Sequence, residues 1–240
     1  MNLVIDSGNT RFKAALFEGT TLMQKATFES VTEFADWSAK FVVNHVLVSS
    51  VNHDAARLLE LVPTTGLKLE LTPGLSLPIQ INYATPNTLG MDRIAAACGA
   101  YELYTGHDCL VVDAGTCINY EFIDKHGAYH GGAISPGLAM RFQAMHTFTS
   151  RLPLVKAIDT APLIGNSTES CLQSGAQNGM LAEVEGIIHH YETRYPGIRV
   201  ILCGGDYSFF ENKVKHSIFV APDLVLTGLN RILRYHAEIG

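Results

Sequence analysis

The sequence predicts an α/β protein built from two related halves. An apolar run that ends in an acid, a small residue and a glycine occurs at Leu3–Gly8 and again at Leu110–Gly115, 107 positions later. Each copy predicts a buried strand followed by a tight turn. Further apolar segments follow both copies in the same order, which indicates an internal duplication. Two halves that face each other with one carboxylate each would suit nucleotide phosphates and a metal ion.

Composition excludes several classes of protein. The chain has 240 residues, 47% of them hydrophobic, and a net charge of −6, which argues against a nucleic-acid-binding protein because such proteins carry a basic face. No apolar run approaches the ~20 residues that would span a bilayer, and no signal peptide precedes the first predicted strand. The five cysteines lack CxxC spacing, as expected for reduced thiols. We therefore expect a cytoplasmic protein without a membrane or nucleic-acid partner.

The first half is predicted to begin with a three-strand meander and to end in an alanine-rich helix. Glu18-Gly19-Thr20 marks a turn of the meander, and Ser30 with Glu33 has the spacing of a capping box. Pro73 to Pro86 lacks periodicity and predicts a loop. The expected elements are strands at 3–6, 11–17, 22–28, 45–49 and 67–71, and helices at 31–41, 53–61 (after an Asn52 cap) and 89–104.

The second half is predicted to repeat the meander and then to become helical. Ser135-Pro136 predicts a helix start, since serine caps helices and proline favours the first helical position. The expected elements are strands at 110–113, 118–123, 129–134 and 200–203, and helices at 136–148, 169–195 and 222–237.

The turns after the repeated strands are the first candidate sites. Gly8 and Gly115 allow backbone N–H groups to approach a phosphate, and hydroxyl or amide side chains follow both glycines. Lys13 could reach a phosphate oxygen from the next strand. Asp6 would repel phosphate, so its expected ligand is Mg²⁺. The alternative is an ordinary structural turn at both places.

Three further segments combine glycine with polar residues. Gly90-Met91-Asp92-Arg93 opens a predicted helix, where an acid either interacts with the helix dipole or orients a substrate hydroxyl. Gly131–Gly137 turns a strand into a helix with small residues, which permits close approach of an anion. Gly204-Gly205-Asp206 could lie against a flat ligand such as adenine, or simply end a strand. The chain contains no GxxxxGK[ST], GxGxxG, HExxH or GxSxG motif.

Taken in order, these segments resemble the type III pantothenate kinases of the acetate kinase, sugar kinase, Hsp70 and actin superfamily. The similarity covers nearly the whole chain and includes Gly165–Thr168 and Asp223–Leu229. It implies a duplicated ribonuclease-H-like, actin-like ATPase fold with two mixed five-stranded sheets, flanking helices and a cleft. Residues 1–107 would form the half with the ATP phosphate loop, and residues 108–240 the half with the dimer and cation site.

The resemblance also implies site residues. ATP would bind Asp6, Ser7, Gly8, Asn9, Thr10, Arg11, Phe12, Lys13 and Thr116. Pantothenate would bind Tyr83, Gly90, Met91, Asp92 and Arg93, and Thr168 of a homodimer partner. Asp113 would hold a monovalent cation, K⁺ or NH₄⁺.

The expected reaction is phosphorylation of pantothenate by ATP to 4′-phosphopantothenate, the first step of coenzyme A synthesis. Asp92 would orient the hydroxyl and accept its proton during an in-line transfer. Another small-molecule kinase on this fold and a non-enzymatic ligand sensor are the alternatives. A panel of substrates tested with ATP would distinguish another small-molecule kinase from a pantothenate kinase. Loss of the acidic residues would favour a ligand sensor, yet Asp6, Asp92 and Asp113 are present.

Overall fold

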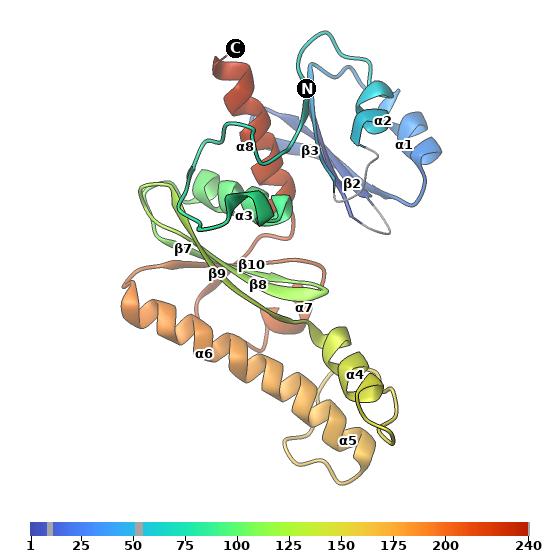
Figure 1. Ribbon diagram of the computed structural model, residues 1–240, viewed down its shortest axis with the longest axis vertical. Helices are drawn as coiled ribbons and strands as arrows, with labels where there is room; N and C mark the ends of the chain where they lie inside the picture. Colours follow the sequence, from blue (N-terminus) through green and yellow to red (C-terminus); the bar gives the residue numbers. More distant parts are fainter. Residues whose placement is uncertain (9–11, 51–54, 240) are drawn as a thin grey trace. The chain divides into compact units, whose positions relative to one another are not determined.

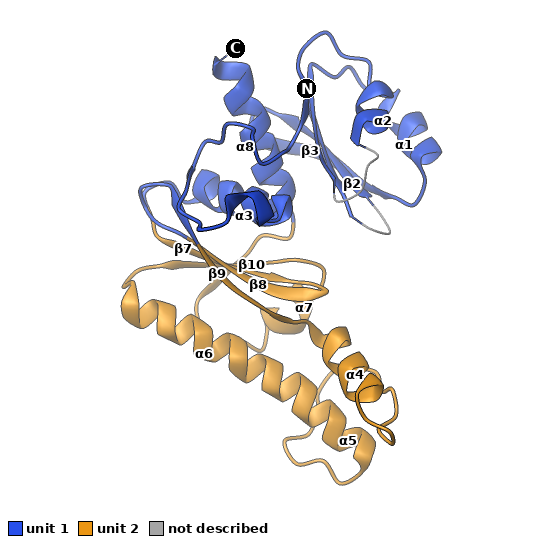
Figure 2. Cartoon of the chain, viewed as in Figure 1, with its two compact units in different colours: residues 1–106, 123–130, 223–240 blue, residues 107–122, 131–222 orange. Residues whose placement is uncertain are grey.

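The chain forms two compact units in the computed structural model (Figures 1 and 2), which describes residues 1–8, 12–50 and 55–239. The first unit comprises residues 1–106, 123–130 and 223–240, and the second comprises residues 107–122 and 131–222. The sequence places a single boundary between residues 107 and 108. The structure has a boundary next to this point and, in addition, assigns the C-terminal helix to the first unit.

The first unit contains a five-stranded sheet in the order β3-β2-β1-β4-β5. β1 is antiparallel to β2 and parallel to β4, so the sheet is mixed. Leu3, Val4 and Ile5 in β1 are fully buried, which explains their continuous apolar run. The strands are β1 (Asn2–Ser7), β2 (Phe12–Glu18), β3 (Thr21–Phe28), β4 (His45–Ser50) and β5 (Lys68–Glu70).

Two helices of the first unit pack backbone against backbone. α3 (Met91–Leu103) and α8 (Leu224–Ile239) meet at Gly99 and Gly228, where a Cβ atom on Gly228 would lie 1.7 Å from the carbonyl oxygen of Ala95. All residues from 93 to 100 of α3 are buried, so this helix lacks a polar face in its middle. The unit's other helices are α1 (Val31–Ser38), α2 (Ala55–Glu60) and the short η1 (Pro86–Thr88).

The second sheet is also mixed, and its strands follow the order β11-β10-β7-β8-β9-β6. The resemblance implies five strands here, and the sixth is the two-residue β6, which pairs with Ala128 and Tyr129 of β9. These two residues and β6 all belong to the first unit. The strands are β6 (Gln80–Ile81), β7 (Cys109–Ala114), β8 (Cys117–Ile123), β9 (Ala128–Pro136), β10 (Arg199–Cys203) and β11 (Ile218–Val220).

The long helix of the second unit covers one face of its sheet (Figure 1). Met180, Val184 and Ile188 of this helix share a core cluster with Leu110 and Val112 of β7. The helix predicted over 169–195 is found as three consecutive segments, of which the middle one is π-helical. The unit's helical segments are α4 (Leu138–Thr147), α5 (Thr168–Gln173), η2 (Ser174–Asn178), α6 (Gly179–Arg194) and α7 (Tyr207–Glu211).

The predicted helix start at Ser135-Pro136 is wrong by two residues. Both residues end β9, and Gly137 caps α4 instead. The Gly137 N–H donates to the carbonyl oxygen of Thr116 at 3.0 Å, which holds the chain in strand form up to this point. The Ser135 hydroxyl accepts from Arg141 at 2.9 Å and so does not cap the helix.

Candidate functional site

Asp6 lies at the end of β1, directly opposite Lys13 of β2 in the antiparallel register. The pKa of Asp6 is raised to about 6, because burial and then the nearby Asp92 carboxylate both raise it, while Lys13 lowers it by a smaller amount. Asp6 and Asp92 therefore form an acidic pair in the first unit, although 85 residues separate them along the chain. Such a pair is stabilised by a proton or by a cation.

Asp92 is exposed in the first turn of α3. Its Oδ1 accepts from the Arg93 backbone N–H at 2.9 Å. Gly90, the N-cap residue, leaves room for this carboxylate, since a Cβ atom on Gly90 would lie 2.5 Å from Asp92 Oδ1. Met91 is the first residue of the helix. The glycine of this segment thus fixes where the Asp92 carboxylate can lie.

Arg93 and Tyr83 lie against each other in the same unit. The Arg93 side chain is buried, and its guanidinium carbon lies 5.8 Å from the centre of the Tyr83 ring. A guanidinium at this distance from an aromatic ring is held by a cation–π interaction. The structure therefore brings Asp6, Asp92, Arg93, Tyr83 and Lys13 together in one unit.

The other residues expected to bind ATP in the first unit differ in their surroundings, and three of them lie outside the described residues. Asn9, Thr10 and Arg11 lie outside the described residues. Ser7 is buried at the end of β1 and Gly8 follows it. Phe12 belongs to the aromatic core, with ring centres 5.4 Å from Phe28 and 5.6 Å from Phe34.

The second unit holds the turn after β7. Asp113 is half-buried, and the close approach of Gly204 shapes its surroundings. Gly204 has φ +91°, and a Cβ atom there would lie 2.2 Å from the Ala114 carbonyl oxygen and 2.4 Å from Asp113 Oδ1. Thr116 is exposed, and its carbonyl oxygen binds Gly137. The repeated acid–glycine turn and two glycine-rich segments therefore meet in this unit.

Thr168 is the first residue of α5 and is exposed. Ser167 and Ser170, on either side of Thr168 in the sequence, form a capping box, since the Ser167 hydroxyl accepts from the Ser170 N–H at 3.1 Å. Leu163 and Ile164 precede it and are 84% and 83% exposed. The segment before α5 therefore leaves two large apolar side chains open to solvent.

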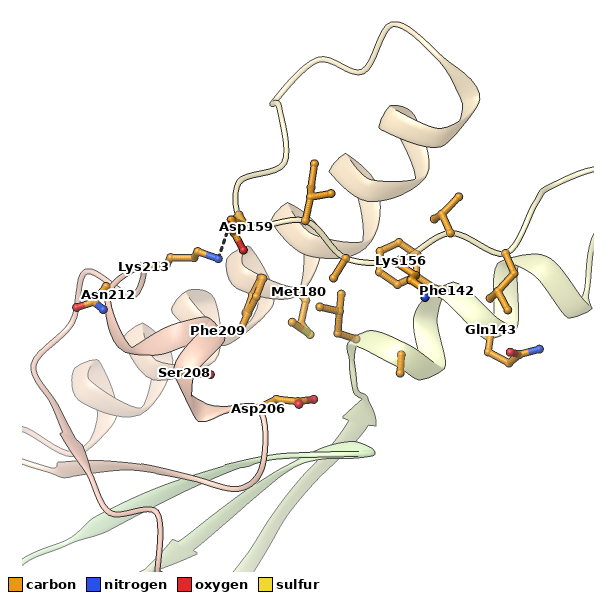
Figure 3. Close-up of a pocket in the computed structure, with 16 residues that line it drawn as sticks. Phe142, Gln143, Lys156, Asp159, Met180, Asp206, Ser208, Phe209, Asn212 and Lys213 are labelled. Carbon is orange, nitrogen blue, oxygen red and sulfur yellow. Dashed lines mark hydrogen bonds between the residues drawn. The ribbon is translucent and has the colours of Figure 1, made fainter.

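A pocket of about 830 Å³ opens in the second unit (Figure 3). Its wall is mostly apolar, with Phe209 and Met180 near each other and Phe142 across from them in the view. Asp206 lines it directly after Gly204-Gly205, and burial raises the pKa of this carboxyl group. Lys213 lies 3.9 Å from the centre of the Phe209 ring and donates to the Asp159 carbonyl oxygen at 2.9 Å.

Sequence reasoning missed a network that holds the strand-to-helix corner of the second unit. Arg141 donates to Glu183 at 2.5 Å and, through Nε, to the carbonyl oxygen of Pro136 at 2.8 Å. Glu183 also accepts from the Tyr120 hydroxyl at 3.0 Å. Hydrogen bonds from Arg141, Ser135 and Tyr120 outweigh burial and lower the pKa of Glu183. The available signal was that Arg141 lies one helical turn after Gly137.

Within the described ranges, no three His, Cys, Asp or Glu side chains gather in a way that would hold a metal ion. Asp6 and Asp92 supply two carboxylates, which matches how Mg²⁺ is usually held, through one or two carboxylates together with substrate phosphates and water.

A family model described as type III pantothenate kinase matches residues 2–190. The chain belongs to the type III pantothenate kinases. The protein of that name from Phocaeicola vulgatus is 41% identical over the full length of both chains, and the one from Cytophaga hutchinsonii is 44% identical over 98% of this chain and 100% of its own. The resemblance found in the sequence motifs is thus confirmed.

Solved structures confirm the fold expected of a type III pantothenate kinase. A putative Baf family transcriptional activator from Campylobacter jejuni matches with a TM-score of 0.65 at 23% identity, over 98% of this chain and 99% of its own. The activator of 2-hydroxyisocaproyl-CoA dehydratase from Clostridium difficile matches with a TM-score of 0.53 at 12% identity, over 99% and 94%. At these identities the matches support the actin-like architecture of two mixed sheets with flanking helices. Among the described helices of this family member, none has the length and apolar character needed to cross a bilayer.

Proposed function

We propose that the chain catalyses the reaction stated in its family name, the ATP-dependent phosphorylation of pantothenate to 4′-phosphopantothenate, which begins coenzyme A synthesis. The observation that carries the proposal is the coupled pair of Asp6 and Asp92, with Arg93 and Tyr83 in the same unit. A kinase needs a carboxylate at the acceptor hydroxyl and oxygen ligands for a divalent cation, and this pair can supply both.

In this proposal Asp92 acts on the primary hydroxyl of pantothenate. Its carboxylate is exposed and lies at the N-terminus of α3. An alcohol is too weak an acid to be deprotonated beforehand, so Asp92 orients the hydroxyl and takes its proton as the new P–O bond forms. Arg93 and Tyr83 bind the rest of the substrate, Arg93 through an anionic group, while Gly90 and Met91 bring the backbone close to it.

The phosphates of ATP are assigned to the turn after β1. Backbone N–H groups near Ser7 and Gly8 and the exposed Lys13 would bind phosphate oxygens, and Asn9, Thr10 and Arg11 continue this turn in the sequence. Phe12 would anchor the turn to the aromatic core. Mg²⁺ held by Asp6 would offset negative charge on the transferred phosphoryl group. The raised pKa of Asp6 fits a carboxylate arranged for a cation.

In the second unit, Asp113 is proposed to bind a monovalent cation, K⁺ or NH₄⁺, and Thr116 a phosphate oxygen. A carboxylate beside a turn rich in carbonyl groups has the oxygen donors that K⁺ prefers. The mostly apolar pocket beside Asp206 is proposed to take the adenine ring of ATP, because pockets of this kind bind flat ring systems and have a few polar groups that orient them.

We further propose a homodimer in which Thr168 completes the substrate site of the partner. Four large apolar side chains between residues 134 and 164 lie outside the pocket lining and are at least 60% exposed, as expected of a surface that a second chain covers. These are Ile134, Phe148, Leu163 and Ile164. In the described residues none of the five cysteines forms a disulfide, which suits the proposed location in the reducing cytoplasm.

A coupled assay of ADP release tests the proposed function. Pantothenate should give turnover that requires Mg²⁺ and is stimulated by K⁺ or NH₄⁺, and phosphopantothenate should appear in equal amount. A panel of sugars and carboxylates serves as the control. Turnover with a panel member and none with pantothenate would favour another kinase on this fold, and ATP binding without any turnover would favour a ligand sensor.

A further inference from the structure

Tyr129 is a fully buried aromatic residue of β9 that none of the sequence motifs includes. Its ring centre lies 6.1 Å from that of Tyr83, with the two rings inclined by 43°. Ring pairs at this distance attract each other beyond their burial alone. Tyr129 therefore contacts a residue that the proposed function assigns to pantothenate.

The backbone strengthens this connection. Tyr83 belongs to a segment with little regular structure, whose two-residue strand β6 pairs with β9. Ile81 lies opposite Tyr129 in this pairing, and the Asn82 N–H donates to the Tyr129 carbonyl oxygen at 2.8 Å. Tyr83 is the next residue along the chain. Its position is thus set by the same residue of β9 through the backbone and through the ring.

Tyr83 in turn lies against Arg93, whose guanidinium carbon is 5.8 Å from the ring centre. Arg93 directly follows Asp92 and is buried. A planar guanidinium loses less freedom on binding when its plane is already fixed by an aromatic neighbour. The three side chains form an ordered series from β9 to the start of α3, entirely within the first unit.

We propose that Tyr129 is a positioning residue for pantothenate: it fixes the plane of the Tyr83 ring, and through it the Arg93 guanidinium that receives the substrate's carboxylate. This rests on the proposed function. Tyr129 does not contact substrate, and its ring rather than its hydroxyl carries the effect. Binding of pantothenate should therefore depend on Tyr129, whereas binding of ATP should not.

The test compares three variants by steady-state kinetics with both substrates varied. Tyr129→Leu removes the ring and should raise KM for pantothenate by roughly tenfold, the scale of about 1.4 kcal/mol, with KM for ATP within about twofold of wild type. Tyr129→Phe keeps the ring and should restore KM for pantothenate to near the wild-type value. Tyr101→Leu is the matched control, because the Tyr101 ring contacts the same hairpin at Gly127, where a Cβ atom would lie 3.0 Å from Tyr101 Cζ.

A merely structural role for Tyr129 would lower the amount of active enzyme and leave both KM values unchanged. That outcome, or equal shifts for Tyr129→Leu and Tyr101→Leu, would overturn the proposal while leaving the kinase function intact. Inactivity of the wild-type enzyme toward pantothenate would instead overturn the proposed function. If Tyr129→Leu does not fold, Tyr129→Met fills more of the same space without a ring and carries the same expectation.

Discussion

Asp92 and Asp6 interact through their carboxylates, so that the charge on Asp92 helps to raise the pKa of Asp6 to about 6. Near neutral pH the folded protein thus holds two negative charges that repel each other. Each proton or cation that binds there relieves this repulsion. Repulsion between the two carboxylates therefore explains both the proposed binding of Mg²⁺ by Asp6 and the cost of folding when no cation is bound.

The first prediction concerns stability against pH. Because the folded pKa of Asp6 is raised above its ordinary 3.8, the folded state binds more protons than the unfolded state between about pH 4 and pH 6. Stability due to this residue is therefore lost as the pH rises through that window. Asp6→Asn should be more stable than wild type above pH 6, by at most about 3 kcal/mol, and should lose this advantage near pH 4. Urea unfolding at several pH values measures it.

The Asp92→Asn variant should retain its fold and ATP binding but lose turnover. Removing a positioned base typically lowers kcat by about 10²–10⁴. KM for ATP should stay within about twofold, since Asp92 acts on the acceptor. Asp36→Asn, an exposed acid on α1, is the control. Near-normal kcat for Asp92→Asn would show that another group takes the proton.

Gly90→Ala should impair catalysis without unfolding the protein. Gly90 has φ −60°, which alanine adopts freely, but its Cβ would lie 2.5 Å from Asp92 Oδ1 and push the carboxylate aside. A displacement of about 1 Å can reduce the rate by roughly 10²-fold. Thermal unfolding should change little. Gly74→Ala, where a Cβ would meet open space, should behave like wild type in both measurements.

Gly204→Ala should destabilise the second unit and reduce activation by K⁺. Its φ of +91° is strained for alanine, and the Cβ would collide with the Ala114 carbonyl oxygen and with Asp113. A loss of at least about 1–3 kcal/mol is expected in denaturant unfolding. Gly205→Ala is a closely matched control, because nothing lies within 4 Å of its Cβ position. If K⁺ activates both variants to the same extent, the turn at Asp113 does not bind the activating cation.

The pocket beside Asp206 predicts a selective effect on ATP. Ala139 lines this pocket from α4 and is exposed, so Ala139→Phe should narrow it without disturbing the core. KM for ATP should rise severalfold, and KM for pantothenate should not change. Met140→Phe on the same helix, outside the pocket lining, controls for general effects on α4. Equal KM values for ATP in the two variants would place the adenine ring elsewhere.

The regular elements of the first half were predictable because local patterns decide them. β2 and β3 form an antiparallel pair close to the predicted ranges, and the turn between them uses Gly19 at φ +58°. The Ser30 hydroxyl accepts from the Glu33 N–H as a helix cap should. β6, β11 and α7 were missed, since elements of two, three and five residues depend on distant partners rather than on their own pattern.

In the candidate site, too, the sequence indicates individual residues but not the contacts between them. Each acid could be found from its place at the end of a strand or the start of a helix. Nothing local indicates that Asp6 and Asp92 interact, because this depends on how α3 packs. The π-helical segment in the long helix of the second unit likewise follows from tertiary contacts. The same holds for the corner at Gly137, which depends on the hydrogen bond to Thr116.

The assignment of α8 to the first unit has a consequence for biosynthesis. Asn230 on this helix is buried, donates to the Gly19 carbonyl oxygen at 2.9 Å and accepts from Asn2 at 3.2 Å. The sheet that contains β1 therefore lacks part of its packing until α8 has been synthesised. Nascent chains that stall before α8 should expose this sheet to chaperones and proteases, so that quality control of this protein depends on synthesis of α8.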